Sequence, residues 1–197
     1  MSRLVLLGPP GAGKGTQAAR IAAEFGIPHI STGEIFRRNA AGDTDLGRRA
    51  QAFMQRGELV PDEVVIDMVG ARLAEDDCRK GFVLDGFPRT VPQALALEDL
   101  LDDAGTPLTL ALRFVIEDGI VVDRLLRRAQ IEGRQDDTHE AISQRLAEYH
   151  TKTEPLEFFY TERGLLRDVA AVGTVDEVTA RALTVVRDPG AGNGVPS

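Results

Sequence analysis

The chain has 197 residues, of which 43% are hydrophobic and 27% are charged, and its formal net charge is −8. This composition is ordinary for one globular domain, and an acidic chain without a block of lysines and arginines is a poor candidate for a nucleic-acid surface. No run of about 18 apolar residues occurs, so no membrane span is expected. The single cysteine, Cys78, cannot form an internal disulfide. A reducing compartment, the cytoplasm, is therefore the expected location.

Short apolar runs alternate along the chain with segments of helical spacing. Buried strands are expected at residues 3–7, 28–31, 81–85, 108–116 and 165–169. Helices are expected at residues 16–25, 33–40, 46–55, 61–74, 91–103, 118–128, 138–163 and 175–187. This alternation predicts an α/β fold with a doubly wound, five-stranded parallel sheet between two layers of helices. The tail at 188–197, rich in Gly and Pro, is expected to be disordered.

The motif with the most specific chemistry is GPPGAGKGT at residues 8–16, between the first strand and the first helix. Glycines let successive backbone N–H groups converge on phosphate oxygens, and the helix N-terminus adds a positive dipole. A glycine-rich turn can also simply join a strand to a helix. The lysine within this one indicates a phosphate loop. Its predicted ATP-binding residues are Gly11, Ala12, Gly13, Lys14, Gly15 and Thr16.

The loop departs from the general pattern at Gly15, where most phosphate-loop enzymes have the Ser or Thr whose hydroxyl binds Mg²⁺. Thr16 follows one residue later. Asp85 ends an apolar strand, and its carboxylate is the predicted metal contact, through water.

Four further motifs occur in a fixed order: STGEIFR at 31–37, DGFPRT at 85–90 with Gln93, GRQDD at 133–137, and RLAEY at 145–149. They resemble the S-T-G-D-x-x-R, D-G-F-P-R-T…Q, G-R-x-D-D and R-L-x-x-Y motifs of adenylate kinases. From residue 8 to residue 173 the chain is similar to the short-lid type of that family. The resemblance implies one P-loop kinase domain over residues 1–197, with a nucleoside-monophosphate insertion at 31–60 and a lid at 127–137.

Each of these motifs contains an arginine, which suits phosphoryl transfer because the guanidinium is permanently charged and binds phosphate bidentately. The acceptor, a phosphate anion, needs no general base. The resemblance implies that Arg37 and Arg89 bind the AMP phosphate and that Arg128 contacts ATP. It also implies that Arg134 and Arg145 bridge the transferring group and contact AMP. The predicted catalytic residues are Lys14, Arg89, Arg128, Arg134 and Arg145. Arg124, four residues before Arg128, shares its helix face.

The resemblance also implies which residues recognise ATP and AMP. Gly173 matches the loop that passes the ATP adenine. The remaining AMP-binding set comprises Thr32, Glu58, Leu59, Val60, Gly86, Phe87, Pro88 and Gln93. Related uridylate/cytidylate kinases usually carry a small apolar residue where Thr32 stands, which favours AMP. Glu34 replaces the usual Asp, and a slight adjustment at a helix start is expected.

About nine residues separate the helices expected on either side of the lid, and none of them is a cysteine. Structural zinc of the four-cysteine kind is therefore excluded on ligand count. His29 is expected to pack on a strand, and His139 and His150 to lie on helix surfaces. A monomer is the expected state.

Two alternatives stay open at this point. The same fold could use UMP or CMP as acceptor, or GTP as donor. A phosphate-loop switch that does not turn over is a different class, but it has no need for a second site with Arg37, Arg89 and Gln93. The main expectation is ATP + AMP converted reversibly to two ADP with Mg²⁺, and turnover with each nucleotide pair discriminates among these possibilities.

Overall fold

The computed structural model describes residues 1–132 and 138–190, and within them five strands form one parallel sheet in the order β2-β3-β1-β4-β5. The strands are β1 (Ser2–Leu7), β2 (His29–Ser31), β3 (Gly81–Asp85), β4 (Leu110–Val115) and β5 (Leu166–Ala170). At the centre of the sheet, Leu4 pairs with Val83 on one side and with Leu110 on the other. The order places β1, and the loop that follows it, in the middle of the sheet.

Helices connect the strands, as parallel pairing requires. The α-helices are α1 (Lys14–Phe25), α2 (Thr32–Ala41), α3 (Asp45–Arg56), α4 (Asp62–Leu73), α5 (Val91–Asp103), α6 (Asp118–Glu132), α7 (His139–Glu148), α8 (Pro155–Glu162) and α9 (Val175–Arg187). A 3₁₀ helix, η1 (Asp76–Lys80), precedes β3, and a π-helical turn, η2 (Tyr149–Thr153), follows α7.

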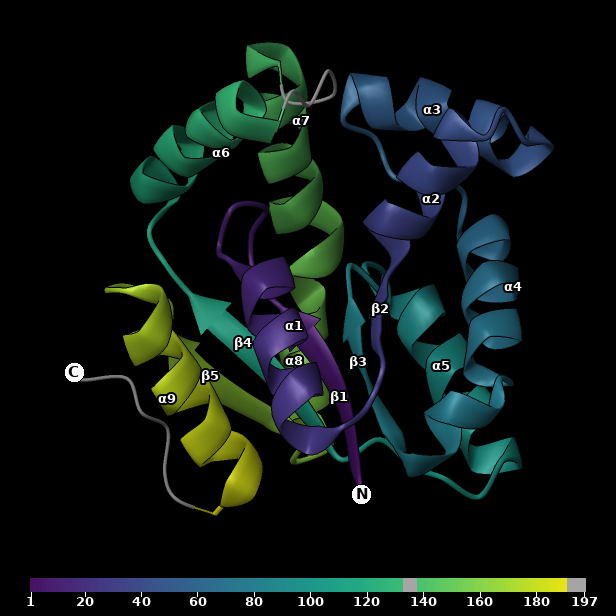
Figure 1. Ribbon diagram of the computed structural model, residues 1–197, viewed down its shortest axis with the longest axis vertical. Helices are drawn as coiled ribbons and strands as arrows, with labels where there is room; N and C mark the ends of the chain where they lie inside the picture. Colours follow the sequence, from purple (N-terminus) through teal and green to yellow (C-terminus); the bar gives the residue numbers. More distant parts are fainter. Residues whose placement is uncertain (133–137, 191–197) are drawn as a thin grey trace.

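Side chains of β1 alternate between the two faces of the sheet, and both faces are buried. Leu4 belongs to an apolar cluster with Ile21 of α1 and with residues of α9. Val5 belongs to a second cluster, with Leu97 of α5 and with residues of α4 and α8. Because helices cover both faces, the central strands β1 and β3 carry continuous apolar runs rather than alternating ones. This three-layer arrangement confirms the predicted fold class (Figure 1).

Two helix pairs extend beyond the carboxyl ends of the strands (Figure 1). The α2–α3 pair occupies most of the segment predicted as the monophosphate insertion. The α6–α7 pair flanks the predicted lid, and α6 continues to Glu132, beyond the predicted end at residue 128. Lid residues 133–137 and tail residues 191–197 lie outside the described residues, and the domain boundaries remain predictions.

The prediction of one helix over residues 138–163 is wrong, because α7, η2 and α8 divide that segment. Pro155 explains the break, since it has no N–H to donate and occupies the first turn of α8. The Glu154 N–H bonds the carbonyl oxygen of Tyr149, five residues back, at 2.8 Å, which is the π pattern. The helix η1 was also not predicted. It buries Cys78, and this burial raises the pKa of the thiol to about 11.

Candidate functional site

A cavity of about 590 Å³ is lined by the segments that follow β1 and β3 and by residues of the α2–α3 pair and the α6–α7 pair. Predicted site residues that line it are Gly11, Gly13, Lys14, Gly15, Thr16, Thr32, Arg37, Glu58, Leu59, Val60, Asp85, Gly86, Arg89, Gln93 and Arg145. They come from segments up to 134 positions apart, Gly11 to Arg145. The fold therefore brings most of the sequence-derived set into one space.

The remaining predicted site residues are not among the described residues that line this cavity. Ala12 and Phe87 are buried in the core, and Pro88 lines a smaller cavity beside η2. Gly173 lies in the loop between β5 and α9 and is not among the lining residues of the main cavity. Arg128 is a residue of α6, and Arg134 lies outside the described residues.

Several lining residues were not predicted. Arg124 lines the cavity and donates from Nη2 to the carbonyl oxygen of Ala171 at 3.3 Å. In the sequence, the feature that could have identified Arg124 as a site residue was its position four residues before Arg128. Phe36, Met54 and Val65 give the cavity an apolar wall, suited to a flat base. Their sequence pattern is that of ordinary core residues, so it carried no signal.

The phosphate loop ends where α1 begins, and the start of this helix has no side-chain cap. Its N-cap, Gly13, has a left-handed backbone, and no acidic residue lies in the first turn. The uncapped N–H groups and the helix dipole make this end a site for an anion. Lys14 Nζ donates to the carbonyl oxygens of Gly8 at 2.7 Å and Pro9 at 2.8 Å, which holds the ammonium group over the loop.

The loop also packs closely against the base of α6 at Gly11. A Cβ on Gly11, whose φ is +83°, would lie 3.0 Å from Leu125 Cγ and 3.1 Å from the carbonyl oxygen of Val121. Only glycine meets both demands at this position. The helix that carries Arg124 and Arg128 is thus seated directly on the phosphate loop.

Asp85 explains the unusual glycine at position 15. A Cβ on Gly15 would lie 3.3 Å from Asp85 Oδ2, so a larger side chain would crowd the carboxylate. His29 Nε2 lies 3.6 Å from the same oxygen. Burial opposes ionisation of Asp85, but His29, Lys14 and Arg89 together lower its pKa below the usual value. An ionised carboxylate facing a phosphate loop is a hard oxygen ligand that suits Mg²⁺.

Arg89 is held at three of its atoms. Its Nε donates to the carbonyl oxygen of Gly86 at 2.9 Å, and its backbone N–H donates to Gln93 Oε1 at 2.8 Å. Its carbonyl oxygen accepts from Thr153 Oγ1 at 2.9 Å. Burial and the charges of Arg145 and Arg37 lower the pKa of Arg89, against the opposing effect of Asp85. Cations gathered in this way favour an anionic ligand among them.

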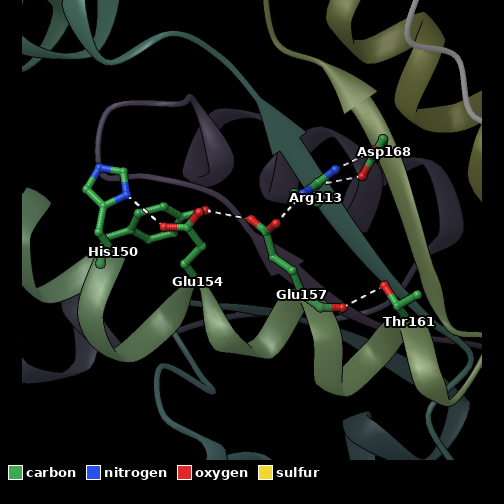
Figure 2. A network of polar contacts seen from close by, with 7 residues as sticks. Arg113, His150, Glu154, Glu157, Thr161 and Asp168 are labelled. Atoms are coloured by element: carbon green, nitrogen blue, oxygen red, sulfur yellow. Dashed lines mark hydrogen bonds and ion pairs between the residues drawn. The ribbon is translucent and has the colours of Figure 1, made fainter.

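The turn η2, which carries Thr153, is tied to the sheet by a polar network (Figure 2). Arg113 of β4 binds Asp168 of β5 through Nε at 2.7 Å and Nη2 at 2.6 Å. It also pairs with Glu157 of α8, which accepts from the hydroxyl of Tyr149 at 3.3 Å. The hydrogen bond to Asp168 outweighs partial burial and raises the pKa of Arg113. The network therefore connects β4 and the edge strand β5 to the turn behind Arg89.

His150, in the same turn, lies on the surface as predicted and bridges two carboxylates. Its Nδ1 lies 2.9 Å from Glu154 Oε2 and its Nε2 lies 2.9 Å from Asp118 Oδ2. Asp118 is the first residue of α6. Glu148, the residue just before the turn, has a side chain that is only 14% exposed and pairs with Lys152.

Comparison with known proteins fits this geometry. The sequence model described as adenylate kinase matches residues 6–165. The chain is 52% identical to the adenylate kinase of Thermobifida fusca over 185 residues, covering 94% of this chain and 98% of the relative. It is 50% identical to that of Clavibacter michiganensis subsp. michiganensis over 195 residues, covering 99% and 96% respectively.

The chain belongs to the adenylate kinase family. The adenylate kinase of Rhodococcus erythropolis is similar as well, with 52% identity over 184 residues, 93% of this chain and 98% of the relative. Family membership confirms the predictions of an adenylate kinase and of an ATP:AMP phosphotransferase that were drawn from the motifs. In this member of the adenylate kinase family, no helix of the described residues is long and apolar enough to cross a membrane. The described part of the chain also holds no cluster of three or more metal-ligating side chains.

Proposed function

We propose that the cavity transfers the terminal phosphoryl group of ATP to AMP, giving two ADP, with the donor on the phosphate loop and the acceptor beside α2. The observation that carries this proposal is that two cationic groups face one cavity. Lys14 and the start of α1 form one, and Arg37, Arg89 and Arg145 form the other. Phosphoryl transfer needs donor and acceptor anions in line, with their charge neutralised.

Each cation has a separate role in the proposal. Lys14 leaves the carbonyl oxygens of Gly8 and Pro9 to bind the β- and γ-phosphates of ATP. Arg37 and Arg89 bind the phosphate of AMP; the bond from Nε to Gly86 directs the Arg89 guanidinium, and bonds to Gln93 and Thr153 hold the backbone of Arg89. Arg145 and Arg134 neutralise the group in transfer, and Arg128 binds the ATP phosphates. The adenine of ATP passes the loop at Gly173.

The acceptor base lies against the apolar wall of Phe36, Met54 and Val65. Thr32 is 3% exposed and donates to the carbonyl oxygen of Gly86 at 3.0 Å, so its own lone pairs remain available to the base. Gln93 supplies an amide, and residues 58–60 supply backbone groups. An amide edge in this orientation complements the amino group and unprotonated ring nitrogen of adenine, which supports AMP over UMP.

Mg²⁺ belongs in this proposal through Asp85, with the nucleotide phosphates and water as its other ligands. Bound Mg²⁺ would neutralise phosphate charge during transfer. We also propose that the chain acts as a monomer in the cytoplasm, where adenine nucleotides are made and used.

The test is ADP formation with each donor–acceptor pair, ATP or GTP with AMP, UMP or CMP. We expect ATP with AMP to give the highest kcat/KM. The variant Lys14→Ala should lose at least about 100-fold in kcat, because a charge aimed at the transferring group is removed. Lys80→Ala, exposed in η1, is the matched control. A Lys14→Ala protein with full activity, or a wild type inactive with ATP and AMP, would contradict the proposal.

A further inference from the structure

Asp62, which does not line the cavity, contacts the amide of Gln93, which does. Gln93 is 2% exposed, and its Nε2 donates to Asp62 Oδ1 at 2.7 Å. The other carboxylate oxygen of Asp62 accepts from the hydroxyl of Thr90 at 2.9 Å. Asp62 is the first residue of α4, and Thr90 is the N-cap of α5. Two helix starts therefore meet at the amide that faces the acceptor base.

The partners of Gln93 allow only one orientation of its amide. A carboxylate only accepts hydrogen bonds, so the Gln93 atom facing Asp62 must be the amino nitrogen. The backbone N–H of Arg89 only donates, and it lies 2.8 Å from Gln93 Oε1. A flipped amide would bring oxygen toward carboxylate and N–H toward N–H, losing two bonds and adding two repulsive contacts.

What remains of the locked amide is one N–H and one oxygen lone pair. Adenine offers an amino group at C6 beside an unprotonated ring nitrogen, which matches this pair. Hypoxanthine, the base of IMP, has an oxygen at C6 and a proton on N1, so it needs the reverse arrangement. An unrestrained glutamine amide could flip and pair with either base, whereas the locked amide pairs with adenine only.

We propose that Asp62 is a positioning residue that makes the acceptor site select a 6-amino over a 6-oxo purine by locking the Gln93 amide. The proposal rests on the proposed function only in taking Gln93 to face the acceptor base. It assigns the selectivity to a residue that makes no contact with the nucleotide.

The deciding variant is Asp62→Asn, which keeps the shape of the side chain. The Asn amide can present its amino group to Gln93 while its oxygen still accepts from Thr90, so Asp62 no longer excludes the flipped Gln93 and only the Arg89 N–H opposes it. We expect the ratio of kcat/KM for AMP to that for IMP to fall at least fivefold. The change should appear mainly in the KM of the acceptor, with the KM of ATP unchanged.

Glu63→Gln is the matched control, because it removes one negative charge from the same first turn of α4 on an exposed side chain. It should leave the AMP to IMP ratio unchanged. If Asp62→Asn does not fold, Asp62→Ser replaces it, since a hydroxyl can also donate or accept. Equilibrium binding of AMP and of IMP without donor measures the same ratio independently of turnover.

A ratio that falls less than fivefold, or falls equally in Glu63→Gln, would overturn the proposal. A uniform loss of kcat with both acceptors at an unchanged ratio would also overturn it, since a merely structural role predicts that result. A wild type that binds AMP in preference to IMP but does not turn over would count against the proposed function alone.

Discussion

At the scale of single residues, Thr153 acts on the nucleotide cavity through Arg89. Its hydroxyl donates to the Arg89 carbonyl oxygen at 2.9 Å, and Thr153 itself does not line the main cavity. Thr153→Val would leave that carbonyl without this donor, at a net cost of about 1 kcal/mol. We expect kcat/KM for AMP to fall about fivefold, the equivalent of that energy, with little change in the KM of ATP.

The matched control for this prediction is Thr161→Val. The Thr161 hydroxyl donates to the carbonyl oxygen of Glu157 at 2.7 Å within α8 (Figure 2). It should alter the free energy of unfolding slightly and leave the kinetics of both substrates unchanged. Equal kinetic effects of the two variants would show that Thr153 does not act through Arg89.

The residue scale also separates what the sequence could predict from what it could not. Lys14, Asp85 and Arg89 were predicted because chemistry and motif spacing depend on the residue itself. Asp62 and Thr153 escaped because their roles come from contacts 31 and 64 positions away along the chain. A single sequence does not reveal which of many similar hydroxyls and carboxylates makes such a contact.

At the scale of elements, His150 joins the turn η2 to the start of α6, and so links the ends of the α6–α7 pair that lie farthest along the chain from the predicted lid. Hydrogen bonding to Glu154 is the main cause of its raised pKa, partial burial opposes it slightly, and Asp118 adds to it. The edge of the ring also contacts Tyr149. Protonated imidazole is therefore favoured in the folded chain.

The sign of the pH dependence follows from this shift. Stabilisation by His150 is complete below its unfolded pKa of about 6.5 and is lost as the pH rises through the higher folded value. Comparing the Tm of the wild type and of His150→Gln, we expect a larger difference at about pH 5.5 than at about pH 9. His139→Gln, on the exposed first turn of α7, is the control. A difference independent of pH would contradict the role of the charge.

The element scale also holds the clearest misprediction. Apolar spacing predicted one helix across residues 138–163, and the spacing continues through η2 almost unbroken. Pro155 stops α-helical bonding locally, but a π turn absorbs one extra residue and lets the chain run on. The strands and most helices could be predicted because apolar runs and glycine stops mark them directly. The π turn could not be predicted, because no residue pattern in this segment distinguishes it from an α-helical turn.

At the scale of the whole molecule, the predicted monophosphate insertion meets α7, the helix that follows the predicted lid, at Gly57. This residue ends α3 with a φ of +74°, and a Cβ there would lie 2.5 Å from the carbonyl oxygen of Ala141 in α7. Gly57→Ala should push α3 away from α7 and raise the KM of AMP several-fold. Unfolding in urea should show a loss beyond the roughly 1 kcal/mol expected for backbone strain alone.

The variant Gly26→Ala separates the effect of backbone strain from the effect of the contact between α3 and α7. Gly26 ends α1 with a φ of +62°, but a Cβ there meets nothing within 4 Å. It should show the backbone strain without a change in KM. If the two variants behaved alike in both stability and kinetics, the contact between α3 and α7 would have no part in binding.

The triple anchoring of Arg89 has a consequence for entropy. An arginine side chain carries about 2 kcal/mol of rotamer entropy, which a phosphate must overcome if it is to order the side chain on binding. In Arg89 the bonds to Gln93 and Thr153 hold the backbone, and the bond from Nε to the carbonyl oxygen of Gly86 orders the side chain when the chain folds. Each turnover then begins with this guanidinium already partly ordered, so the phosphate of AMP has less of that penalty to overcome at Arg89.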